Sequence, residues 1–146
     1  MEQSTILSRG EQVTYEVVAD EAILIDMASG TYFSLNEVGT VFWEALDGRR
    51  TLAQIATRIA KAYARKATEF VAALQAVETE DAPVSLKKLT EKFGVDDELT
   101  RSCYKRVKAG EGDAVIAELS APEEMVLADI QELAENLAAE NLVSTV

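Results

Sequence analysis

The chain has 146 residues, of which 48% are hydrophobic and 27% charged, a composition typical of a globular domain. Its 26 acidic and 14 basic residues give a net charge of −12, which disfavours binding to nucleic-acid phosphates. The chain has no histidine and one cysteine, Cys103, which excludes Ser-His-Asp and Cys-His catalysis, histidine-ligated metals and an internal disulfide. We therefore expect no enzyme activity, no metal and no cofactor.

The N-terminal third predicts three β-strands joined by short turns. Two strands rich in β-branched residues span residues 13–18 and 22–27, and a short aromatic strand spans residues 31–35. Gly30 supplies the positive φ that the turn before the third strand requires. These strands should form an antiparallel meander whose last strand has an open edge.

Two amphipathic helices should follow the strands. Asn36 is placed to cap a helix over residues 37–46, which the Asp47-Gly48 pair ends. Thr51 should cap a second helix, along which apolar residues recur every three or four positions as far as Tyr63.

A third amphipathic helix is expected over residues 126–142, near the C-terminus. With the preceding elements it predicts an α+β, winged-helix-like domain, in which a three-stranded antiparallel meander packs with a three-helix bundle. This domain should comprise residues 1–64 and 126–146. Residues 65–125 between the two parts should form an inserted all-α subdomain.

The expected insertion shows helical spacing of apolar residues in four segments. Its two prolines, Pro83 and Pro122, are the only prolines of the chain, and each should lie at a helix start. The apolar positions are Phe70, Leu74, Val77, Leu86, Leu89, Phe93, Leu99, Cys103, Val107, Val115, Ile116 and Leu119. Residues 87–108 carry a net charge of +3, so the rest of the chain carries −15.

Three segments resemble the PqqD-like family. Residues 30–36, Gly-Thr-Tyr-Phe-Ser-Leu-Asn, are similar to its G-x-Y-x-L-N strand end. Residues 46–56 are similar to its L-D-G and R-T-x-x-x-I-A patterns. Residues 129–143 are similar to its closing helix, with Asn141 where glycine is usual, and asparagine tolerates the left-handed conformation required there. The resemblance covers residues 1–64 and 126–146.

The resemblance implies a RiPP recognition element, which is a non-catalytic peptide-binding domain. Such domains hold the leader of a ribosomally synthesised precursor peptide and present it to a modifying enzyme, often a radical-SAM maturase. The leader adds as a strand to the open sheet edge and packs against the last helix. Strand addition also follows from the physics of an edge strand, whose unpaired N–H and C=O groups accept a further strand.

The expected peptide-binding residues lie on two elements. The edge strand contributes Thr31, Tyr32, Phe33, Ser34 and Leu35. One side of the last helix contributes Asp129, Leu133, Asn136, Leu137 and Glu140, which recur at helical spacing. The acidic members of this wall suit a leader that carries Lys or Arg.

The insertion is open to several interpretations. Residues 86–107 resemble a helix-turn-helix, which as a DNA-binding motif would make the chain a transcriptional regulator. Asp96, Asp97 and Glu98 lead its second helix, however, where groove-reading helices avoid acids, so nucleic acid is not expected as a partner. The other interpretations are a subdomain that only buries its own leucines, a peptide-like segment lying in the leader cleft, and a contact for an acidic partner through Arg101, Lys105, Arg106 and Lys108.

The location expected from the sequence is cytoplasmic. The N-terminal residues are polar and lack a basic signal-peptide region, and no apolar run approaches the roughly 20 residues that span a bilayer. No membrane partner is therefore expected. A homodimer formed by pairing or swapping of strands or helices remains open, because an open edge pairs with itself.

Overall fold

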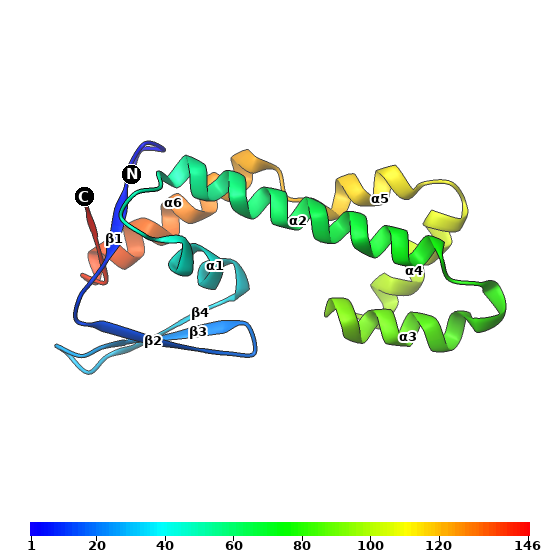
Figure 1. Ribbon diagram of the computed structural model, residues 1–146, viewed down its shortest axis with the longest axis horizontal. Helices are drawn as coiled ribbons and strands as arrows, with labels where there is room; N and C mark the ends of the chain where they lie inside the picture. The colour runs from blue at the N-terminus through cyan, green and yellow to red at the C-terminus, as the bar shows by residue number, and fades with distance from the viewer. The chain divides into compact units, whose positions relative to one another are not determined.

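The computed structural model describes residues 1–146 and groups them in two units (Figure 1). Unit 1 comprises residues 1–60 and 122–146, and unit 2 comprises residues 61–121. Helix α2 (Leu52–Gln75) contributes residues to both. The boundary expected after residue 64 therefore falls inside a helix.

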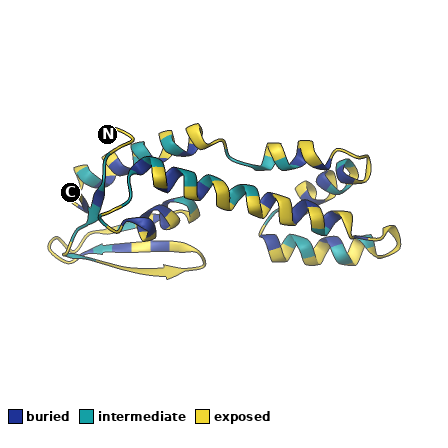
Figure 2. Cartoon of the chain, turned by 45° about the horizontal axis from the view of Figure 1, so that its top comes forward, coloured by how far each residue is buried: buried dark blue, intermediate teal, exposed yellow.

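Unit 1 contains the predicted meander. Strands β2 (Val13–Val18), β3 (Glu21–Asp26) and β4 (Tyr32–Leu35) pair antiparallel in the order β2-β3-β4. Leu24 of β3 lies opposite Tyr15 and Phe33, and it is fully buried. By contrast, β2 is exposed along almost its whole length (Figure 2). The α+β class and the three-stranded sheet are thus confirmed.

Both turns of the β2-β3-β4 meander contain residues in the left-handed backbone conformation. Gly30 has φ +77°, as expected before β4. The turn between β2 and β3 places Ala19 and Asp20 at φ 52° and 65°. Two consecutive left-handed residues are the geometry of a two-residue hairpin turn that matches the twist of the strands, although glycine and asparagine are the usual residues there.

A second, two-stranded sheet was not predicted from the sequence. Strand β1 (Leu7–Arg9) pairs antiparallel with β5 (Val143–Thr145), and Leu7 and Val143 are buried beneath it. Each strand has three residues, too few to show the period of two that marks a strand. The pairing also joins segments at opposite ends of the chain, which no local pattern reveals.

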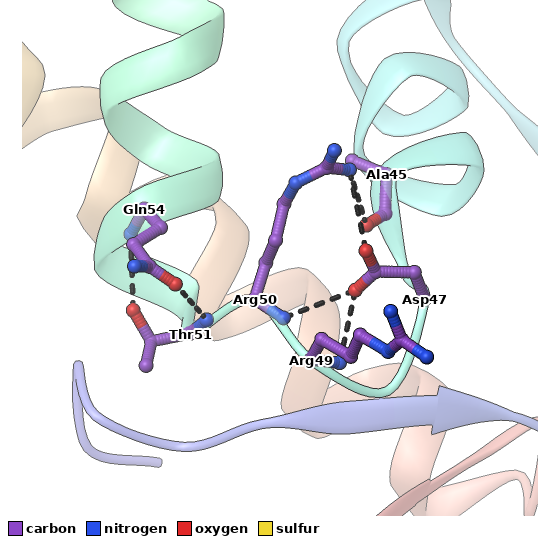
Figure 3. Close-up of polar contacts among 6 residues, drawn as sticks. All are labelled: Ala45, Asp47, Arg49, Arg50, Thr51 and Gln54. Carbon is purple, nitrogen blue, oxygen red and sulfur yellow. Dashed lines mark hydrogen bonds and ion pairs between the residues drawn. The ribbon is translucent and has the colours of Figure 1, made fainter.

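The helix caps of unit 1 agree with the prediction. Helix α1 (Glu37–Ala45) begins after Asn36, whose side-chain oxygen accepts a hydrogen bond from the Gly39 N–H at 2.8 Å. Helix α2 begins with a capping box: the Gln54 side chain accepts from the Thr51 N–H at 2.9 Å, and the Thr51 hydroxyl accepts from the Gln54 N–H at 3.1 Å (Figure 3).

Helix α6 (Glu123–Ala139) forms the C-terminal helix of unit 1, starting three residues earlier than predicted and ending three residues earlier. Pro122 is its N-cap residue, which confirms the proline as a marker of a helix start. Asn141 follows the helix with φ 60°, the left-handed conformation expected of it. The Leu142 N–H then donates to the Leu137 carbonyl at 2.9 Å and closes the helix end.

The connection between α1 and α2 is organised by Asp47 (Figure 3). Its Oδ1 accepts hydrogen bonds from the backbone N–H groups of Arg49 and Arg50, at 2.9 and 3.0 Å. The Arg50 guanidinium lies 3.6 Å from Asp47 Oδ2 and 3.5 Å from the Ala45 carbonyl oxygen. The two backbone N–H donors hold the pKa of Asp47 below its ordinary value. This segment of the PqqD-like pattern therefore has a structural role.

Unit 2 is helical, as predicted. It contains the C-terminal part of α2 and, in chain order, η1 (Thr79–Asp81), α3 (Ala82–Phe93), α4 (Asp97–Lys108) and α5 (Gly112–Leu119). Its core consists of Phe70, Val71, Leu74, Val77, Leu86, Phe93, Cys103, Val107 and Val115. Pro83 lies in the first turn of α3, at a helix start as expected.

Two features of unit 2 differ from the prediction. Helix α2 continues through Gln75, where two helical segments were expected, because residues 52–75 contain no glycine or proline to end it. Leu99 was expected on an apolar stripe, but its side chain is exposed in the first turn of α4. The other predicted apolar positions agree with the prediction, since Leu89, Ile116 and Leu119 are partly buried and pack against the core.

The Thr40 side chain of α1 connects this helix to the sheet of unit 1 through hydrogen bonds. Its buried hydroxyl accepts a hydrogen bond from the Ala22 N–H at 2.7 Å and donates to the Asn36 carbonyl at 2.8 Å. We expect Thr40→Val to lower the free energy of unfolding by about 1–3 kcal/mol, because the buried Ala22 N–H loses its acceptor. Urea denaturation measures this loss. Thr68→Val, at an exposed hydroxyl of α2, should change stability by less than about 0.5 kcal/mol, and equal losses would contradict the prediction.

Candidate functional site

The β4 edge of the sheet is free, because β4 pairs with β3 alone. The Asp26 N–H donates to the Thr31 carbonyl at 3.0 Å. In an antiparallel pair, every second residue directs its N–H and C=O groups to the neighbouring strand, so this bond fixes which residues of β4 do so. The N–H and C=O groups of Phe33 and Leu35 therefore face β3. Those of Tyr32 and Ser34 face the free edge, so these two residues offer the main-chain groups that a further strand would need.

The predicted edge residues differ in what they expose. The Tyr32 side chain is 70% exposed and that of Ser34 is also exposed, whereas Phe33 is partly buried. Leu35 is 6% exposed and belongs to the core. Thr31 precedes the strand, and its carbonyl oxygen already accepts a hydrogen bond from the Asp26 N–H. The free edge of β4 thus presents the backbone N–H and C=O groups of Tyr32 and Ser34. The strand is exposed at Tyr32 and buried at Leu35.

The predicted wall on α6 is mostly accessible. Asp129, Asn136 and Glu140 are exposed, and Leu133 is partly buried. Leu137 is 4% exposed and packs in the core, in line with Ile130 and Ala134. The accessible part of the wall is therefore one partly buried leucine flanked by polar and acidic side chains.

The two halves of the predicted site meet at Gly39. A Cβ atom built on Gly39 would lie 3.2 Å from Leu35 Cβ, at the end of β4, and 3.4 Å from Leu133 Cδ2 of α6. Leu133 therefore lies beside the end of the edge strand. Sequence reasoning did not select Gly39 or Thr40, although a glycine inside a helix is unfavourable and signals close packing.

Unit 1 carries most of the negative charge of the chain. It contains 15 acidic and 4 basic residues, a net charge of −11, whereas unit 2 carries −1. Helix α6 has acidic residues but no basic residue. The electrostatic potential around the α6 wall therefore favours a cationic ligand.

The four basic residues expected to contact an acidic partner lie in unit 2. Arg101 pairs with Asp97 at 3.0 Å, and Arg106 binds Glu118 through both terminal nitrogens. The hydrogen bond from Arg106 holds the pKa of Glu118 below its ordinary value. The remaining two are exposed lysines: Lys108 donates to the Gln75 carbonyl at 3.0 Å, and Lys105 makes no ion pair.

The helix pair that resembles a helix-turn-helix is formed by α3 and α4. Gly94 turns the chain with φ +66°, and Asp96 caps α4 by accepting from the Leu99 N–H at 2.7 Å. Asp97 and Glu98 occupy the first turn of α4 and are exposed. Acids at this end of the helix repel phosphates.

The groups available for chemistry are few. No cluster of three or more His, Cys, Asp and Glu side chains is placed to hold a metal ion. Cys103 is 4% exposed, and burial raises the pKa of its thiol, which disfavours the reactive thiolate. None of the helices is long and apolar enough to cross a membrane.

Comparison with known proteins gives a family match and a structural neighbour. No curated protein matches the chain. A solved structure described as "TbiB1 in Complex with the TbiA(beta) Leader Peptide" is similar over 94% of this chain and 94% of its own, with 18% identity and a TM-score of 0.48. Residues 21–80 match the model of the family "Coenzyme PQQ synthesis protein D (PqqD)", from β3 to η1. The resemblance to the PqqD family is thereby confirmed over these residues.

Proposed function

We propose that unit 1 binds the leader of a ribosomally synthesised precursor peptide by strand addition at β4 and presents it to a modifying enzyme. In this role the chain is a non-catalytic carrier. The leader would extend the β2-β3-β4 sheet by a fourth strand, and its side chains would contact the accessible wall of α6. The family match over residues 21–80, which includes β4, supports the proposal.

The observation that carries the proposal is the free edge of β4 with Leu133 beside its end. Tyr32 and Ser34 direct their N–H and C=O groups to this edge, and Leu133 offers an apolar contact within reach of the same strand. Strand addition derives its affinity from main-chain hydrogen bonds and its specificity from side-chain contacts. The site supplies both kinds of interaction.

The charge of the site indicates the kind of leader. Asp129 lies one turn before Leu133 on α6, and Glu140 is the C-cap residue of that helix; no basic residue of the helix offsets these two carboxylates. A leader with an apolar residue next to Leu133 and Lys or Arg on either side would match this wall. The affinity of such a leader should decrease with added salt, because exposed charges are screened.

Amide hydrogen exchange tests the proposal directly. The probe is the leader of a short precursor peptide encoded beside the gene for this chain, added in excess to the full-length protein. We expect the N–H groups of Tyr32 and Ser34 to become protected, because they gain partners, while those of Phe33 and Leu35 are protected already by β3. NMR resolves these neighbouring amides.

The other free edge of the sheet provides an internal control. The Met27 N–H donates to the Gln12 carbonyl at 2.9 Å, so Val13, Tyr15 and Val17 direct their N–H groups away from β3. The Val13 N–H already donates to the Gly10 carbonyl at 3.1 Å, which leaves those of Tyr15 and Val17 as the control amides. Their protection should not change when the leader binds. Protection of the Tyr15 and Val17 amides in place of those of Tyr32 and Ser34 would overturn the assignment to β4.

A further inference from the structure

A groove between helices α3 and α4 of unit 2 has no role in leader binding at β4. It has a volume of about 630 Å³ and is lined by one side of each helix. Leu86 and Thr90 line it from α3, one turn apart, and Asp97, Arg101 and Lys105 line it from α4 at the same spacing. At a rise of about 1.5 Å per residue, the groove follows its helices for roughly two and a half turns, the length of a short peptide helix.

The floor of the groove is apolar. Leu86, which is 7% exposed, contributes to the floor, and Ala82 lies one turn before it. Tyr104 closes the opposite side, and its hydroxyl donates to the Val77 carbonyl at 3.4 Å, which fixes the ring. The floor therefore suits aliphatic side chains spaced one helical turn apart, as in peptides that bind grooves with one helix face.

The rim of the groove carries more positive than negative charge. Arg101 and Asp97 neutralise each other at 3.0 Å. Lys87 and Lys105 remain on opposite walls, against the single carboxylate of Glu91. Since unit 1 carries −11, this rim is a cationic surface on an otherwise acidic chain.

We propose that this groove binds an acidic amphipathic helix of a partner protein. Aliphatic side chains of the partner helix would contact Leu86 and Tyr104, and its carboxylates would lie near Lys87 and Lys105. This second docking site would be independent of the β4 edge, so a chain that carries a leader could also engage a partner. The proposal stands on the groove alone and does not depend on leader binding.

A designed peptide tests the proposal. The probe is a fluorescein-labelled helical peptide of about 11 residues, with two leucines four positions apart and glutamates on its other face. We expect it to bind the full-length protein in fluorescence anisotropy, and Lys105→Glu to weaken binding by about fivefold to tenfold. Lys105 is exposed and makes no ion pair, so the variant should fold normally.

Matched controls separate docking from general charge attraction. Lys88→Glu makes the same charge change at an exposed position of α3 outside the groove, and it should change affinity by less than about twofold. The probe with both leucines replaced by alanine, and the probe with lysines in place of glutamates, should bind at least about tenfold more weakly. No binding of the original probe, equal effects of Lys88→Glu and Lys105→Glu, or equal binding of the three peptides would overturn the proposal.

Discussion

Ser34→Pro should weaken leader binding by at least about tenfold while the protein remains folded. The Ser34 N–H faces the free edge of β4, so proline removes a donor that a leader strand would use and leaves the hydrogen bonds to β3 intact. The proline ring also occupies space that the added strand needs. Proline is tolerated at outward positions of edge strands for the same reason. Fluorescence anisotropy with the labelled leader measures the loss.

Two variants at the same strand control this experiment. Ser34→Ala removes the hydroxyl and keeps the N–H, so leader affinity should change by less than about threefold. Phe33→Pro removes a donor that faces β3, and it should lower the melting temperature by several degrees, because it breaks the ladder between β3 and β4. Unchanged affinity in a folded Ser34→Pro protein would rule out strand addition at β4.

The contrast between Phe33 and Ser34 shows where sequence reasoning about the site reached its limit. The short aromatic stretch at residues 31–35 predicted the last strand of a meander, with an open edge. It gave no reason to distinguish the backbone of Phe33 from that of Ser34. The distinction depends on the register with β3, fixed by the hydrogen bond between Asp26 and Thr31, and register is a property of two strands together.

Elements with local signals were predicted well. Asn36, Thr51 and Asn141 were each assigned from their own chemistry, and each has the expected cap or left-handed conformation. Strands β1 and β5 were missed because their pairing joins residues more than 130 positions apart. Gly39 was missed because its importance lies in the close approach of Leu35 and Leu133, which come from distant parts of the chain.

The basic residues of the segment 87–108 also show that contacts between distant residues cannot be predicted from local sequence. The sequence shows a net charge of +3 over residues 87–108, which predicted a surface for an acidic partner. The structure pairs Arg106 with Glu118, which lies outside this stretch, and Arg101 with Asp97 inside it. Lys105 is left exposed at the rim of the α3-α4 groove. The net charge of a segment therefore overestimates the charge that is available to a partner.

A large loss of stability is expected from Phe70→Ala in unit 2. Phe70 is 2% exposed and packs edge-to-face on Phe93, with ring centres 5.2 Å apart. Truncation of a buried phenylalanine costs about 3–5 kcal/mol, because it removes apolar contacts and leaves a cavity. All the proposed leader-binding residues lie in unit 1, so we expect leader affinity to remain within about twofold wherever unit 1 stays folded.

The only tryptophan of the chain makes this prediction testable for each unit. Trp43 is fully buried in unit 1, edge-to-face with Tyr15, so its fluorescence reports the unfolding of unit 1. Far-UV circular dichroism reports the helices of both units. In Phe70→Ala, the thermal transition seen by circular dichroism should move to lower temperature more than the transition seen by fluorescence.

Phe42→Ala is the matched control, because Phe42 is fully buried in unit 1. It should move the fluorescence transition by the larger amount and weaken leader binding at temperatures where unit 1 unfolds. The two variants together assign leader binding to one unit. A Phe70→Ala protein that keeps its tryptophan transition but loses leader affinity would instead show that unit 2 takes part in binding, because unit 1 would then be intact and insufficient.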